Sequence, residues 1–159
     1  MTDDKELLIS GIDPAAWVRG CIEKVKSSDD WKSRWNSAWF ETYLELGGVK
    51  KSVGNKSCPK NCVKGLYEFG RIKDTAQPYL EADIRELQDK YGYKNAVYGL
   101  AACEKLSGGS YAGHSELADD VYSYLQGQYE MDVPKNGDQG PVKITFMLNE
   151  LSLLNLSAD

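Results

Sequence analysis

Residues 57–74, SCPKNCVKGLYEFGRIKD, constrain the fold most strongly because they predict one helix with both ends marked. Ser57 or Cys58 is a suitable N-cap, and Pro59 suits the first helical turn, where its missing N–H leaves no hydrogen bond unmade. Gly70 lies where a left-handed residue commonly ends a helix. The apolar positions between these ends recur at helical spacing and are Cys62, Val63, Leu66 and Phe69.

The same segment carries a resemblance to a known protein family. The run Ser57-Cys58-Pro59-Lys60, followed by Gly65-Leu66, Glu68, Gly70 and Ile72, resembles a motif of a family of small, uncharacterised bacterial helical proteins. The similarity extends weakly to the surroundings of Trp39 and to an apolar C-terminal helix. Where the family favours a small residue and a phenylalanine after the lysine, this chain has Asn61 and Cys62. The resemblance implies a compact helical bacterial protein, and it implies no activity, cofactor or catalytic residue.

Composition indicates one ordinary globular domain over residues 1–159. A chain of 159 residues, 42% hydrophobic and 27% charged, is long enough to bury a core. No apolar run approaches the roughly 20 residues that a membrane-spanning helix needs, so no membrane partner is expected. The N-terminus, MTDDKELLISG, is acidic where a secretory signal is basic, which predicts a cytoplasmic location and reduced cysteines.

The net charge of −5 is unevenly distributed along the chain. Residues 50–73 hold seven basic side chains against the single acid Glu68, a local charge of +6 that leaves −11 for the rest. An acidic body with one basic segment is unlike a general nucleic-acid-binding protein, so a nucleic-acid partner is not expected. The basic segment is suited to holding one small anion locally.

The remaining periodicity predicts an all-α domain, a compact bundle of six or seven helices. Asp13 and Pro14 mark the start of the first helix, and Pro141 opens a last helix that is apolar nearly all round and therefore central. Residues 1–12 are expected to be loosely ordered, and residues 49–57 are expected to form a basic loop. The expected helices cover residues 14–26, 31–46, 57–69, 81–91, 94–106, 116–129 and a segment that begins at 141.

Large aromatic residues form a stripe on the second predicted helix. Trp31, Trp35, Trp39 and Tyr43 recur every four residues, so they wind slowly along one face. One interpretation is that the stripe packs into the core or into a subunit interface, in which case Trp35→Ala costs about 3–5 kcal/mol of stability. The other is that it forms the aromatic wall of a ligand pocket.

The chain also repeats a short pattern. Residues 60–66, KNCVKGL, match residues 94–100, KNAVYGL, at five of seven positions. Each copy contains a glycine, Gly65 or Gly99, which costs a helix about 1 kcal/mol relative to alanine. Such glycines are tolerated where another helix crosses closely, so the two helices are expected to pack against each other or against a common neighbour. Two copies are too few for a solenoid.

The cysteines and the single histidine offer limited chemistry. Cys58 and Cys62 lie one turn apart on one helical face, but structural zinc sites normally need a second pair from another segment, so no metal is expected. Cys58 at a helix start beside lysines has the surroundings of a reactive thiol, yet the only histidine, His114, is distant in sequence. The sequence contains no phosphate-loop or dinucleotide-binding motif, and no catalytic residue or cofactor is assigned.

Three functions fit these patterns, in order of preference. The first is a non-catalytic interaction or regulatory module that forms a homo-oligomer, since the chain is rich in large aromatics and poor in catalytic pairs. The second is a module that binds a small anionic ligand at residues 56–64, using the N–H groups of Lys60, Asn61 and Cys62. The third is an enzyme that uses Cys58. The candidate ligand-binding residues are Lys56, Cys58, Lys60, Lys64, Trp35 and Trp39.

Overall fold

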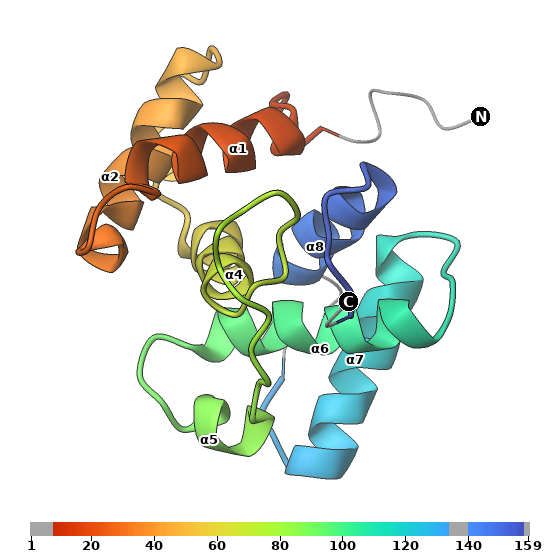
Figure 1. Ribbon diagram of the computed structural model, residues 1–159. Coiled ribbons are helices and arrows are strands. Elements are labelled where there is room, and N and C mark those ends of the chain that lie inside the picture. The colour runs from red at the N-terminus through yellow and green to blue at the C-terminus, as the bar shows by residue number, and fades with distance from the viewer. Residues whose placement is uncertain (1–7, 134–139, 158–159) are drawn as a thin grey trace.

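The computed structural model describes residues 8–133 and 140–157, and every structural statement below concerns these residues. Within them the chain forms eight helices and no sheet, which confirms the predicted all-α class (Figure 1). Seven of the helices correspond to predicted ones, and α3 is an additional single turn. The helices are α1 (Pro14–Val25), α2 (Trp31–Glu45), α3 (Lys51–Gly54), α4 (Ser57–Glu68), α5 (Ile84–Gln88), α6 (Lys94–Gly108), α7 (His114–Tyr129) and α8 (Pro141–Glu150).

The first helix starts where the sequence predicts. The Asp13 carboxylate oxygen Oδ1 accepts a hydrogen bond from the backbone N–H of Ala15 at 3.0 Å, and Pro14 occupies the first helical position. The cap satisfies one of the N–H groups that a helix start leaves without a partner, and proline has no N–H to satisfy. The buried face of α1 consists of Pro14, Trp17, Val18, Cys21, Ile22 and Val25.

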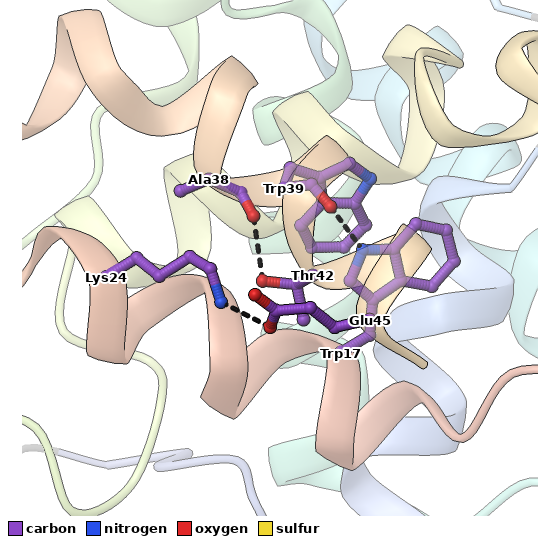
Figure 2. Close-up of polar contacts among 6 residues, drawn as sticks. All are labelled: Trp17, Lys24, Ala38, Trp39, Thr42 and Glu45. Carbon is purple, nitrogen blue, oxygen red and sulfur yellow. Dashed lines mark hydrogen bonds and ion pairs between the residues drawn. The ribbon is translucent and has the colours of Figure 1, made fainter. Parts of the chain in front are cut away.

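α1 packs across α2 through aromatic rings and polar contacts (Figure 2). The indole N–H of Trp17 donates to the carbonyl oxygen of Trp39 at 2.9 Å, and the two indole rings stack with their centroids 4.6 Å apart. At the edge of this contact, Lys24 pairs with Glu45 at 2.6 Å. These interactions fix the angle between the two helices and bury both indoles between them.

The predicted aromatic stripe of α2 lies in the core. Trp35 and Trp39 are 0% exposed. The indole N–H of Trp35 donates to the carbonyl oxygen of Lys60 at 3.0 Å, and its ring stacks on Tyr67 of α4 with centroids 5.7 Å apart. The stripe therefore joins α2 to α1 on one side and to α4 on the other, and its burial favours the structural interpretation over a ligand-pocket wall.

The two copies of the repeated pattern meet where α4 and α6 cross. A Cβ added to Gly65 would overlap the Cβ of Ala96, and a Cβ added to Gly99 would be 2.5 Å from the Sγ of Cys62. Cys62 and Ala96 occupy the same position in the two copies, so the contact is reciprocal: the glycine of each copy receives the third residue of the other. The prediction that these two helices pack together is confirmed.

α4 ends at Glu68, and Gly70 is the left-handed residue that follows its C-cap, as predicted. Gly70 has a φ of +75°, its N–H donates to the carbonyl oxygen of Tyr67 at 3.1 Å, and the N–H of Arg71 donates to that of Leu66 at 2.8 Å. This pair of hydrogen bonds is the Schellman motif, which satisfies two of the carbonyl groups that a helix end leaves unpaired. A Cβ at position 70 would also overlap the carbonyl oxygen of Pro78. The turn therefore requires glycine for two reasons, the positive φ and the lack of space for a side chain.

α8 packs against α1, α4, α6 and α7, as its apolar sequence predicts (Figure 1). The Sγ of Cys62 in α4 lies 3.4 Å from the carbonyl oxygen of Pro141 and 3.4 Å from the Oγ1 of Thr145. After α8 the chain returns to the end of α4, where Leu154 forms an isolated bridge with Ile72. A contact in the middle of α4 and a bridge just beyond its end thus hold α8 and the segment after it beside α4.

The structure corrects two helix lengths. α5 is five residues long instead of the predicted 81–91, and its start is capped by Asp83, whose Oδ1 accepts a hydrogen bond from the Glu86 N–H at 3.3 Å. α8 ends at Glu150, although the apolar pattern continues to Leu154. A turn with a left-handed Ser152 ends the helix, and Leu153 and Leu154 are buried beyond it, so the apolar pattern there reflects burial outside a helix.

The structure also differs from the expectations of a basic loop and a loosely ordered start. The short helix α3 interrupts the expected loop, because Gly54 packs against the rings of Phe40 and Tyr43. The approach is so close that a Cβ added at this position would overlap both rings. Residues 9–12 form a tight turn in which Ile9 and Ile12 exchange two backbone hydrogen bonds of 2.9 Å. Residues 1–7 of the same expectation lie outside the described part of the chain.

Candidate anion-binding site at the starts of α4 and α8

The start of α4 has no side-chain cap. The helix begins at Ser57, and the extended residue Lys56 is its N-cap, so the prediction that Ser57 or Cys58 caps the helix is wrong. Pro59 then occupies the third helical position, which like the first needs no N–H for an intrahelical hydrogen bond. The backbone donors without an intrahelical acceptor are therefore those of Ser57 and Cys58, and the predicted donors from residue 60 onward lie inside the helix.

The start of α8 is built in the same way. Gly140 is its N-cap with a φ of +116°, no side chain of a described residue caps the helix, and Pro141 occupies the first helical position. The N–H groups of Val142 and Lys143 consequently have no intrahelical acceptor. A Cβ at Gly140 would be 3.5 Å from the Cβ of Cys58, so the two helix starts are in contact.

A cavity of about 570 Å³ lies beside these two helix starts. Lys56 and Lys143 supply its basic groups, and neither lysine forms an ion pair with a described residue. Its apolar lining is formed by Ile9, Trp17, Val53 and Pro59. The cavity thus combines two positive helix ends, two ammonium groups and an apolar wall.

The predicted lysines do not surround one cavity. Lys56 lines the cavity described above, whereas Lys64 lines a separate cavity of about 230 Å³ near Glu68 and Tyr93. Lys60 is 9% exposed and lines neither cavity, and its backbone carbonyl oxygen accepts the hydrogen bond from the indole N–H of Trp35. Burial, with a smaller contribution from the ammonium group of Lys64, lowers the pKa of Lys60. Only one of the three lysines is therefore placed to serve the site.

Trp35 and Trp39 are also placed away from the site. Both indoles are enclosed by α1, α2 and α4, so a ligand would reach them only if the core opened. Trp17 of α1, which was not a candidate, lies next to the cavity, but like Trp35 and Trp39 it is 0% exposed. Its ring stacks on Trp39, so the predicted stripe supports the cavity wall from behind.

Cys58 is half-buried at the first turn of α4, while Cys21, Cys62 and Cys103 are buried. None of the four cysteines forms a disulfide with another described residue. Among the described residues, no hydrogen bond joins Cys58 to a base, and no cluster of three or more histidine, cysteine or acidic side chains is arranged for a metal ion. A reaction based on Cys58 therefore stays a prediction without a structural arrangement that supports it.

A second sizeable cavity, about 600 Å³, lies between α1 and the loop that follows α4. Its basic residues are Arg19, Lys26 and Lys73, but Glu23 and Asp74 line it as well, and Glu23 already pairs with Lys26 at 2.9 Å. The mixed charges make this cavity a weaker anion site than the one at the two helix starts.

Sequence reasoning missed Lys143 and Gly140. The signal that carries them is the Gly-Pro pair at 140–141, which marks a helix start, followed by a lysine in the first turn. The same kind of signal led to α4, but only the folded chain brings the two starts together.

Comparison of the chain with protein-family models, curated proteins and solved structures finds no match. Among the described helices, none combines the length and apolar character needed to cross a bilayer.

Proposed function

We propose that the protein binds a small anionic ligand in the cavity at the starts of α4 and α8. The observation that carries this proposal is the contact between the two helix starts, where Gly140 lies against Cys58 beside Lys56 and Lys143. A helix start carries roughly half a positive charge, and two adjoining starts repel each other unless an anion lies between or beside them. An anion in the cavity would remove this repulsion.

The surrounding groups add to the positive potential. Lys56 and Lys143 are both cavity-lining residues without an acidic partner among the described residues. Ammonium groups beside helix starts are of the kind that binds phosphate, sulfate or carboxylate. A volume of about 570 Å³ is within the range of ordinary small-molecule sites.

Titration with inorganic phosphate at fixed ionic strength tests the proposal. We expect the melting temperature to rise with phosphate concentration, because a ligand that binds only the folded state stabilises it by RT ln(1 + L/Kd), where L is the free ligand concentration. Lys56→Ala and Lys143→Ala should each weaken phosphate binding about tenfold, the loss expected for one charge-assisted contact. Isothermal titration calorimetry measures both affinities.

Lys94→Ala is the matched control for these variants. Lys94 is an exposed lysine at the start of α6, another helix start, but it does not line the cavity. Its replacement should leave phosphate affinity unchanged. A melting temperature that stays flat across the phosphate titration would contradict the proposal, and so would equal losses of affinity in all three variants.

The other two functions suggested by the sequence, a homo-oligomeric interaction module and an enzyme using Cys58, remain predictions. Neither has a contact in the described residues that favours it as the paired helix starts favour anion binding.

A further inference from the structure

The cavity between α1 and the loop that follows α4 carries charges of both signs (Figure 1). Its volume of about 600 Å³ is within the range of small-molecule sites. Two of its charged residues, Glu23 and Lys26 of α1, pair with each other at 2.9 Å. The other three, Arg19, Lys73 and Asp74, form no ion pair with a described residue. The cavity therefore presents cations and an anion that do not neutralise one another.

The loop that forms one wall of this cavity is held together by a buried arginine. Arg71 is 6% exposed, and its guanidinium donates hydrogen bonds to the carbonyl oxygens of Phe69 and, at 2.8 Å, of Leu80. The same guanidinium lies 3.7 Å from the centre of the Tyr79 ring. These contacts join the two ends of the loop, so its shape is set by the protein itself.

The segment after α8 fixes the same loop from the other side. The N–H of Lys73 donates to the carbonyl oxygen of Leu153 at 2.8 Å, and the N–H of Asn155 donates to that of Arg71 at 2.8 Å. The side chains of Lys73 and Asp74 are therefore carried on a backbone that is already ordered. A ligand at this wall would not have to supply the free energy of ordering it.

The floor of the cavity is apolar but almost closed. Ile22, Tyr67 and Ile72 line it, and they are 7%, 2% and 3% exposed. They offer a ligand little apolar surface, so the charged groups at the rim dominate recognition. An ion of one sign would be attracted by some of these groups and repelled by others. A molecule that carries both charges can satisfy both.

We propose that this cavity binds a small zwitterion of the amino-acid class, a free amino acid or a short peptide. Its carboxylate would pair with Arg19, whose planar guanidinium can donate two parallel hydrogen bonds, and its ammonium group would pair with Asp74. The inference is independent of the proposed function, because this cavity shares no lining residue with the one at the starts of α4 and α8.

Leucine and two singly charged analogues test the proposal by calorimetry. Isocaproate is leucine without its ammonium group, and isoamylamine is leucine without its carboxylate, so all three have the same apolar part. Leucine should bind about tenfold more tightly than either analogue, the gain expected from one additional charge-assisted contact. Leucyl-leucine is the fourth probe: binding tighter than that of leucine identifies a peptide site, and weaker binding identifies a site for the free amino acid.

Two variants locate the charges of the ligand. Arg19→Gln should weaken binding of leucine and isocaproate about tenfold without weakening that of isoamylamine. Asp74→Asn should weaken binding of leucine and isoamylamine by a similar factor without weakening that of isocaproate. Asparagine suits the left-handed backbone at position 74, where φ is +61°, so this variant should keep the loop intact.

Arg34→Gln and Asp89→Asn are the matched controls. Both residues are exposed and neither lines the cavity, so leucine affinity should not change. Circular dichroism checks that all four variants are folded. The proposal is overturned if leucine binds no more tightly than its two analogues, if the control variants lose as much affinity as the cavity variants, or if neither leucine nor leucyl-leucine shows saturable binding. Phosphate affinity should be the same in all four variants, which keeps this test separate from that of the anion site.

Discussion

At the scale of single residues, Tyr98 is one of the core residues with an unmet hydrogen bond. It is 2% exposed in α6, its ring meets the edge of Tyr122 at 5.2 Å between centroids, and its hydroxyl has no hydrogen-bond partner among the described residues. A buried hydroxyl without a partner loses its hydration and gains no replacement, which destabilises the folded state. Burial, followed by the charges of Asp132 and Cys58, raises the pKa of Tyr98 to about 12.

Tyr98→Phe should therefore stabilise the protein, although most core substitutions destabilise. Removing the unpaired hydroxyl without changing the ring should raise the free energy of unfolding by about 1 kcal/mol in urea denaturation at pH 7. The difference in unfolding free energy between Tyr98→Phe and the wild type should grow as the pH rises from about 10 to about 12. In this range the tyrosine of the unfolded wild type ionises while that of the folded wild type stays protonated, which destabilises the wild type alone. A loss of stability at pH 7 would mean that the hydroxyl is hydrogen-bonded in solution.

At the scale of elements, the reciprocal crossing of α4 and α6 organises the centre of the fold. Each helix supplies one glycine and one small partner, Gly65 with Ala96 and Gly99 with Cys62. The two helix axes approach more closely than ordinary side chains would permit. Because α4 carries one of the two helix starts of the candidate site, the crossing also fixes the position of that site.

Gly65→Ala should destabilise the protein by about 1–3 kcal/mol, the usual cost of overpacking, despite the better helix propensity of alanine. Adding Ala96→Gly should recover part of the loss, because it removes the Cβ that the new side chain would overlap. Gly127→Ala in α7 is the control: nothing lies within 4 Å of the added Cβ, so it should stabilise by up to about 1 kcal/mol. Similar effects of Gly65→Ala and Gly127→Ala would rule out a close crossing.

Much of the fold could be predicted from local signals. Asp13 with Pro14, Gly70 and Pro141 mark helix ends through their own backbone chemistry, and the repeated glycines predicted the crossing of α4 and α6. Local signals failed where the outcome depends on distant contacts. α3 forms because Gly54 packs against Phe40 and Tyr43, and neither ring is close to it in sequence.

The site was only partly predictable, for a related reason. Proline is accepted at the third helical position as well as at the first, so Pro59 could not fix where α4 begins, and the donors were assigned to the wrong residues. Lys56 was identified from the basic segment. Its partner Lys143 lies in a different helix, and only the packing of α8 against α4 brings the two lysines to one cavity.

At the scale of the whole molecule, the site is a local positive region on an acidic protein. The net charge is −5, so long-range attraction of anions is weak and binding must come from groups in contact with the ligand. The account consequently predicts a well-localised response to an anion. A diffuse interaction with scattered surface lysines would instead give a response spread over the whole surface.

Amide NMR spectroscopy measures this localisation most directly. With phosphate added at constant ionic strength, the account predicts saturable shifts that are largest for the backbone N–H groups of Ser57, Cys58, Val142 and Lys143. Shifts of equal size at Lys94 and other exposed lysines, or no saturable shift at the starts of α4 and α8, would contradict the account.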